Sequence, residues 1–270
     1  MNDERTMKNR TMLTKPSKYV LFAMLMAFLS SCSIEKQMGK QFVEQSQGAR
    51  MAVYFPEKAK ASNQYSTQYQ SYSKVLDDFN QDMFLDVMYN AFAEAMDDYN
   101  VEIYLPDDPD NVKVDSANWL VLLSNVEITG SMIRYDDVLF DDYYQTVKSY
   151  PLNHVNIASW FELNDGEWLP VQFGEINLMD GFRSSVEGFS SNNYRFEIDT
   201  LKLDDVYNAA VFLGKTYAGY VYDCFMNRYI SKRLDEMESV RSFFVPYDTY
   251  KRSLKAISTD SEDKFVEVGE

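Results

Sequence analysis

The residues that most often carry out catalysis are scarce in this chain. His154 is the only histidine among the 270 residues, so a zinc site built from several histidines is excluded. The chain has no Gly-x-Ser-x-Gly turn to present a nucleophilic serine, and it has neither Gly-x-Gly-x-x-Gly nor a P-loop to hold a phosphate. A Ser-His-Asp triad could use only His154, which we expect to be a turn or surface residue. We therefore predict that the protein is not an enzyme and uses no cofactor or metal.

Two clusters of aspartates could bind cations or partners. They are Asp107, Asp108 and Asp110, and Asp136, Asp137, Asp141 and Asp142. Loop carboxylates suit calcium, but neither cluster has the glycine and glutamate spacing of an EF-hand. A catalytic carboxylate pair is conceivable among 42 acidic residues, but the sequence singles out no pair. We expect both clusters to lie in solvated loops, and we predict that the second is a docking surface for a basic protein.

The most specific pattern surrounds Cys32. Lys15 and Lys18 precede an apolar stretch, residues 19–29, which ends in Leu29-Ser-Ser-Cys32. This stretch is too short to span a bilayer, which needs about 20 residues, but its length suits the core of a signal peptide. The ending resembles the box that bacterial lipoprotein signal peptidase recognises: an aliphatic residue, two small residues and an acceptor cysteine. The resemblance covers only the first 32 residues.

The resemblance implies a lipid anchor. Residues 1–31 would be removed as a signal peptide, the Cys32 thiol would carry a diacylglycerol, and its new amino group would carry an acyl chain such as palmitate. Several acyl chains together hold a protein firmly on a membrane. Two alternatives remain, a cleaved secretory signal followed by a coincidental cysteine and an uncleaved anchor. Met7 or Met12 is an alternative start.

The residues after Cys32 bear on location. In the enterobacterial sorting rule an aspartate there favours the inner membrane, so Ser33 resembles the outer-membrane case. Many surface-displayed lipoproteins of the Bacteroidota carry an acidic run after the cysteine, whereas Ser-Ile-Glu-Lys-Gln has one acid and one base. We therefore expect an outer-membrane, lipid-anchored protein that faces the periplasm, with surface display as the alternative.

Charge and cysteine content narrow the partners. The net charge is −16, which disfavours nucleic acid and anionic headgroups as partners. Cys224 is the only other cysteine, so a chain lipidated at Cys32 has no intrachain disulfide. Because Cys224 lies in an apolar helical stripe, we expect it to be a small buried residue.

The hydrophobic pattern predicts an α+β fold, in which two long amphipathic helices pack on one face of a mainly antiparallel sheet. The predicted helices are 75–98 and 203–238, and the predicted strands are 51–55, 101–105, 119–134, 155–163, 168–173 and 194–198. Asn164-Asp-Gly166 predicts a tight hairpin turn with Trp160 and Trp168 paired across it. Residues 57–74 and 136–150 are predicted loops.

The same reading divides the chain into four parts. They are a signal peptide at 1–31, a lipidated tether at 32–50, a single domain at 51–257 and a flexible tail at 258–270. The order of elements resembles that of outer-membrane assembly lipoproteins, although no sequence motif carries this likeness and fold alone does not determine function.

These observations favour a membrane-anchored lipoprotein with a non-enzymatic binding or envelope-assembly accessory role and a protein partner. One alternative is a glycan- or ligand-binding lipoprotein, which predicts a groove lined by exposed Trp and Tyr. The other is an exported hydrolase, which predicts a deep pocket with a raised-pKa carboxylate, or His154 beside a serine.

Overall fold

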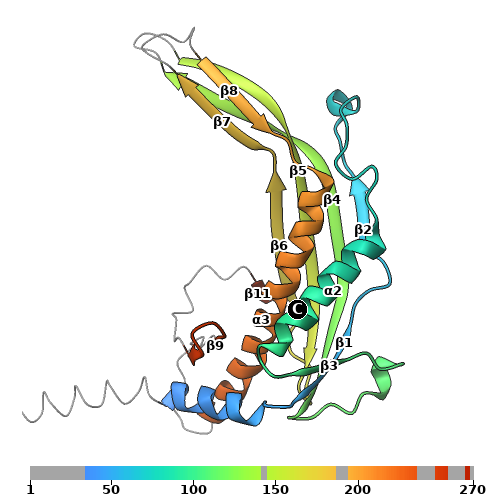
Figure 1. Cartoon of the computed structure of the whole chain (residues 1–270), viewed down its shortest axis with the longest axis vertical. Coiled ribbons are helices and arrows are strands. Elements are labelled where there is room, and N and C mark those ends of the chain that lie inside the picture. Colours follow the sequence, from blue (N-terminus) through green and yellow to red (C-terminus); the bar gives the residue numbers. More distant parts are fainter. Residues whose placement is uncertain (1–33, 141–144, 187–193, 236–246, 255–264, 268–270) are drawn as a thin grey trace, which may run out of the picture.

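The computed structural model describes residues 34–140, 145–186, 194–235, 247–254 and 265–267 (Figure 1). The signal-peptide box that ends at Cys32 lies outside these residues, as do Asp141 and Asp142. Within the described residues, no helix is long and apolar enough to cross a membrane.

The fold is mixed α+β with a mainly antiparallel sheet, as predicted. The sheet has the order β11-β6-β5-β4-β1-β3, and β2 pairs with β4. Only the pairs β1–β3, β1–β4 and β2–β4 are parallel. The elements are β1 (Arg50–Tyr54), β2 (Lys60–Asn63), α2 (Gln81–Asp97), β3 (Glu102–Tyr104), β4 (Asn118–Phe140), β5 (Gln145–Asn164), β6 (Gln172–Met179), β7 (Gly181–Val186), β8 (Tyr194–Asp199), α3 (Leu203–Asp235), β9 (Tyr247–Asp248), β10 (Ser253–Leu254) and β11 (Phe265–Glu267).

A long antiparallel ribbon of β4 and β5 is the main feature of the sheet. The strands have 23 and 20 residues and pair as far as Phe140 and Gln145. At about 3.3 Å per residue, β4 has a contour length of roughly 75 Å. The prediction of a loop over 136–150 is therefore wrong outside the undescribed residues 141–144. Cross-strand pairs such as Val138 with Val147 continue the ladder there, so the acidic side chains do not interrupt it.

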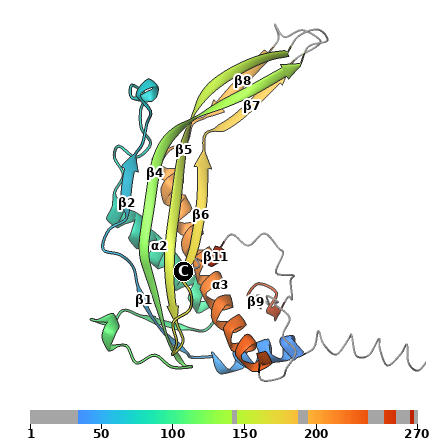
Figure 2. The ribbon, with the colours of Figure 1, turned by 180° about the vertical axis from the view of Figure 1, so that it is seen from behind.

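The far half of this ribbon leaves the body of the molecule. In Figures 1 and 2 it bends away from the helices, and β7 and β8 lie along it. We call residues 131–140 and 145–154, together with β7 and β8, the arm. Strand β7, which the sequence pattern did not predict, pairs with β8 in a separate two-stranded sheet.

Both predicted long helices form, with changed ends. The Asn80 side chain accepts a hydrogen bond from the Met83 N–H at 3.0 Å, and this cap starts α2 six residues later than predicted. α3 begins at Leu203 as predicted, and its predicted end at 238 lies outside the described residues. The strands β4 to β6 lie behind α2 and α3 in Figure 1 and in front of them in Figure 2. Cys224 on α3 is half-buried rather than buried.

The core joins α3 to the sheet through aromatic rings. Phe225 stacks on Trp119 of β4 at 4.8 Å between centroids, and Tyr217 meets Phe161 of β5 edge-on at 4.5 Å. All four side chains are at least 98% buried. Aromatic pairs of this kind stabilise a core beyond the area that they bury.

Two predicted flexible segments prove to be structured. Residues 34–45 form a helix rather than a tether, and Phe42 of this helix stacks on Trp119 with its ring centroid 5.6 Å away. The apolar residues of that short segment recur at helical spacing, which its polar composition concealed. In the predicted tail, Phe265–Glu267 form β11 and pair with β6, because the edge of β6 offers backbone partners.

The chain reverses at Asn164-Asp-Gly166, as predicted, with Gly166 at φ 112°. The connection is wider than a tight turn, because β6 starts only at Gln172. Trp160 therefore contacts Phe173 at 5.0 Å, and Trp168 is 53% exposed, so the predicted pair of tryptophans does not form. The predicted loop 57–74 contains β2.

Candidate functional site

The two described aspartates of the predicted partner surface lie on the arm but face opposite ways. Asp136 and Asp137 are neighbours on β4, and successive side chains of a strand point to opposite faces. Asp136 accepts hydrogen bonds from Ser149 Oγ at 2.5 Å and from Arg134 Nε at 2.7 Å. Both hydrogen bonds lower the pKa of Asp136, and the bond from Ser149 contributes more than the bond from Arg134. The predicted location in a loop is wrong, and these two carboxylates do not form one patch.

Asp137 belongs to a contact between the two hairpins of the arm. Its carboxylate accepts a hydrogen bond from the Tyr194 hydroxyl of β8 at 2.6 Å. Desolvation and this hydrogen bond raise the pKa of Tyr194. The ammonium of Lys148 lies 4.0 Å from the centre of the Tyr194 ring. Asp137 thus holds β8 on the ribbon instead of standing free for a partner.

Aromatic rings complete this contact. Tyr150 of β5 lies 5.0 Å from Phe182 of β7 and 4.6 Å from Phe196 of β8, measured between ring centroids. Tyr135 of β4 lies 4.7 Å from Phe182. The arm is therefore two hairpins held together by rings. The alternation of aromatic residues over 194–198 predicted β8, but nothing local indicated that it would pack on the ribbon.

The arm leaves apolar side chains exposed on both faces. Val138 and Val147 pair across the ribbon and are 39% and 49% exposed, while Phe196 on the other side is 52% exposed. Charged residues, among them Arg134 and Asp136, adjoin them. Apolar residues gathered on an exposed surface and bordered by charges are typical of protein interaction sites. We call Val138 and Val147, which pair with each other on one face of the ribbon, the arm surface.

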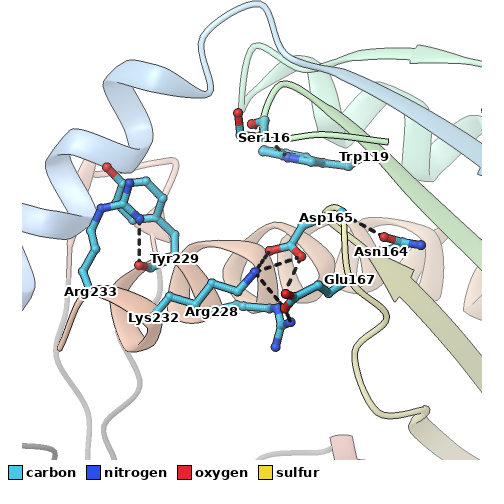
Figure 3. A network of polar contacts seen from close by, with 10 residues as sticks. Ser116, Trp119, Asn164, Asp165, Glu167, Arg228, Tyr229, Lys232 and Arg233 are labelled. Atoms are coloured by element: carbon cyan, nitrogen blue, oxygen red, sulfur yellow. Dashed lines mark hydrogen bonds and ion pairs between the residues drawn. The ribbon is translucent and has the colours of Figure 1, made fainter. Parts of the chain in front are cut away.

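A second candidate lies at the opposite end of the ribbon (Figure 3). Asp165, on the β5–β6 connection, is paired with Arg228 Nε at 3.3 Å and Lys232 Nζ at 3.4 Å. Glu167 is paired with the same two cations at 2.7 and 3.3 Å. The four residues clamp the β5–β6 connection to the last turns of α3, where cations also interact favourably with the helix dipole.

A cavity of about 390 Å³ opens beside this clamp. Phe42, Trp119, Phe225 and Tyr229 line it, together with Lys232 and Arg233. The guanidinium of Arg233 lies 3.2 Å from the centre of the Tyr229 ring. Trp119 is only 2% exposed, so the cavity does not offer the exposed rings that a glycan-binding groove needs. Because Asp165 and Glu167 already neutralise Lys232, we interpret the network as a structural clamp. The basic residues of α3 were visible in the sequence, but their acidic partners across the fold were not.

His154 does lie beside a serine. Its Nδ1 is 3.2 Å from Ser131 Oγ of β4, and its Nε2 is 2.9 Å from Asn177 Oδ1 of β6. All three residues lie on one face of the sheet, on three neighbouring strands. Asn177 also contacts Asn156 and Glu175, so the set continues as a row of cross-strand hydrogen bonds. Such rows stabilise sheets.

The first aspartate cluster caps a short turn. Asp108 accepts hydrogen bonds from the Asp110 N–H at 2.9 Å and from Asn111 Nδ2 at 2.8 Å, and this starts a 3₁₀ turn over Pro109–Asn111. Over the described ranges, no three His, Cys, Asp or Glu side chains are placed to hold a metal ion. Comparison with known protein families and with curated protein sequences finds no match to this chain.

Proposed function

We propose that the protein is an outer-membrane lipoprotein, anchored through Cys32 and facing the periplasm, that uses the arm to dock a protein partner. This is a non-enzymatic binding or envelope-assembly accessory role. The observation that carries the proposal is the arm itself, a paired ribbon that leaves the body and exposes apolar side chains. Neither Val138 nor Val147 belongs to the hydrophobic core formed by the described residues.

The positions of Cys32 and of the arm at opposite ends of β4 support the proposal. Cys32 comes two residues before the helix 34–45, and Phe42 of that helix packs on Trp119, the second residue of β4. The tip of the arm is at the other end of the same strand, whose whole contour is roughly 75 Å long. A lipid on Cys32 would hold one end of the body at the membrane, and the arm would reach away from it.

The proposal also takes α2 and α3 to cover one face of the sheet together. The contacts of Phe225 with Trp119 and of Tyr217 with Phe161 support this for α3. The helices would then stabilise the body and leave the arm free for recognition, since recognition residues usually extend from a rigid scaffold.

Anchoring is tested with Cys32→Ala in cells. The variant should lose acylation and appear in the soluble fraction, while the unchanged chain stays in the outer-membrane fraction. Mass spectrometry of the native protein that shows an intact leader or an unmodified Cys32 would disprove the anchor.

Docking is tested by placing charges on the arm surface. The double variant Val138→Asp, Val147→Asp should lose its cross-linked partner in intact cells, because both charges would be desolvated at the interface. Leu105→Asp is the matched control, since Leu105 is 65% exposed on the body. Equal cross-linking of both variants would remove the arm surface from the proposal.

The carboxylate of Asp136 is tested separately. Asp136→Asn should slow association with a basic partner and flatten the salt dependence of that association. If recovery of the partner at low and high salt is the same as for the unchanged chain, Asp136 serves only the ribbon.

A further inference from the structure

The edge of β6 is covered over only part of its length. β11 pairs with Gln172, Phe173 and Gly174, and no other described strand pairs with that side of β6. Residues 175–179 therefore have a free edge among the described residues, as Figure 1 shows for the end of β6 nearest the arm. A free edge presents a row of unpaired N–H and C=O groups, which proteins normally blunt with lysine, proline or a bulge. The sequence Glu-Ile-Asn-Leu-Met has neither lysine nor proline, and Glu175 is its only charged residue.

α3 forms a wall beside this edge. A groove of about 570 Å³ runs between the edge and the first turns of α3, and Ile176, Leu178, Ala209 and Phe212 make up its apolar lining. Phe212 is 52% exposed, whereas Tyr217, Tyr222 and Phe225 of the same helix are buried in the core. If a strand were added to β6, every second side chain of that strand would lie under Phe212. An exposed sheet edge without a neighbouring helix would not provide this apolar contact.

The groove is acidic. Asp205 of α3 lines it and Glu175 borders it from the other face of β6, while no basic residue lines it. Glu175 accepts hydrogen bonds from Asn156 and Asn177, and Asp205 accepts one from the Lys202 N–H at 2.8 Å. No ion pair is described for either carboxylate in the part of the chain that the structure covers. An occupant with basic side chains would supply the missing positive charge.

We infer that the free edge of β6 accepts an extended segment of a partner protein, in which apolar and basic residues alternate, as an added β-strand. The alternation follows from the two faces of β6. Ile176 and Leu178 face the helices and pack against the core, while Glu175 and Asn177 are exposed on the other face. Successive residues of the added strand would point in turn under Phe212 and beside Glu175. Backbone pairing would supply the affinity and the two faces the specificity.

β11 shows that this edge of β6 can pair with a strand. Phe265–Glu267 add to Gln172–Gly174 in antiparallel register. A second copy of the chain is a poorer occupant, because it would bring Glu175 against a like charge. This inference depends neither on the anchor nor on the arm.

The test uses the full chain purified in detergent and a synthetic peptide that alternates Lys and Val. We expect amide hydrogen exchange of residues 175–179 to slow by about tenfold or more when the peptide is added, since an exchange-competent amide becomes paired. High salt should weaken the effect. A peptide that alternates Glu and Val, and one that alternates Lys and Pro, should give no protection. Protection by the proline peptide, or none by the Lys-Val peptide, would overturn the inference.

Variants of the chain test separately the apolar contact with Phe212 and the charge of Glu175. Phe212→Asp should abolish protection, while Val211→Asp, on the adjacent exposed residue outside the groove lining, should leave it unchanged. Glu175→Lys should reverse the preference toward the Glu-Val peptide, and Glu197→Lys on β8 should not. If Val211→Asp and Phe212→Asp behave alike, the groove is not the binding site.

Two other occupants have distinct signatures. If amides 175–179 are already protected without peptide and lose protection when residues 255–270 are deleted, the chain's own terminus fills the groove and the inference is wrong. If protection instead rises with protein concentration alongside the mass in solution, a second copy is the occupant and the inference is equally wrong.

Discussion

The carboxylate of Asp180 accepts a hydrogen bond from the backbone N–H of Asn153 at 2.7 Å, across 27 positions of sequence. Its other oxygen accepts one from the Leu201 N–H at 2.6 Å. Asp180 is 3% exposed and sits between β6 and β7, where the chain leaves the sheet for the arm. A single buried side chain thus joins the ribbon, the start of β7 and the segment that leads into α3.

This junction predicts a large effect of Asp180→Ala. The variant leaves one buried and one partly buried N–H group without their acceptor, so we expect a loss of about 3 kcal/mol in the free energy of unfolding. Urea denaturation measures it, and Asp199→Ala, at an exposed residue near the same junction, is the control. Faster amide exchange over residues 181–186 should accompany the loss. An unchanged urea midpoint would mean that other contacts hold the arm in place.

The crossing of the two long helices predicts a contrast between two glycines of α3. A Cβ on Gly214 would lie 2.3 Å from the carbonyl oxygen of Met88 and 2.9 Å from Ala91 Cβ. A Cβ on Gly219 would meet only the Tyr99 hydroxyl, at 3.1 Å. Gly214→Ala should therefore destabilise the fold by about 1–3 kcal/mol through overpacking.

Gly219→Ala is the matched control for that change. Both substitutions gain about 0.5–1 kcal/mol of helix propensity, so the difference between them isolates the clash. Thermal unfolding of the two variants gives the comparison. Equal midpoints would contradict the close approach of α2 and α3 at Gly214.

How far the sequence predicted this fold depends on the range of the interactions. Period-two and period-3.6 patterns identified β1, β3, β8 and both long helices, because each pattern lies within a few residues. The start of α2 was predicted too early because Leu76 and Phe79 continue the apolar spacing, whereas the N-cap at Asn80 begins the helix at Gln81. The spacing of apolar residues alone cannot distinguish a non-helical turn that precedes a helix from the first turn of the helix itself.

The candidate sites were less predictable, since they depend on contacts between distant residues. Asp136 and Asp137 were recognised as an acidic cluster, but the strand that separates their faces was taken for a loop. The helix 34–45 was missed because its packing residue, Phe42, meets Trp119 from far along the chain. The groove beside β6 could not be predicted at all, because it needs the relative position of Phe212 and Ile176.

The docked position of the helix 34–45 makes a testable claim about Phe42. Its ring is 5% exposed and contacts Trp119, Tyr222 and Tyr229. Phe42→Ala should cost about 3–5 kcal/mol, the range for a buried ring, and should speed proteolysis near residue 45. Lys40→Ala, on the exposed side of the same helix, should change neither. If Phe42→Ala leaves stability unchanged, residues 34–45 are the flexible tether that their composition indicates.

Stability at high pH should reveal the buried tyrosine that links α3 to β5. Burial raises the pKa of Tyr217 to about 12, although its hydroxyl donates a hydrogen bond to Ser159 Oγ at 2.9 Å. An unfolded chain releases this proton near pH 10, so between about pH 10 and 12 the folded state binds more protons than the unfolded state. The free energy of unfolding therefore falls as pH rises through that window, and below pH 10 the contribution of Tyr217 is fully present.

Tyr217→Phe should weaken this fall. It removes the titrating hydroxyl and should cost about 1 kcal/mol at neutral pH, where the hydrogen bond to Ser159 is lost. Between pH 10 and 12, however, the variant should lose less stability than the unchanged chain, so the two urea midpoints converge. Tyr250→Phe, at a side chain that is 95% exposed, should follow the unchanged chain at every pH. If the urea midpoints of Tyr217→Phe and of the unchanged chain instead change in parallel with pH, Tyr217 has the same pKa in the folded and unfolded states. The ring of Tyr217 would then not be buried between α3 and Phe161.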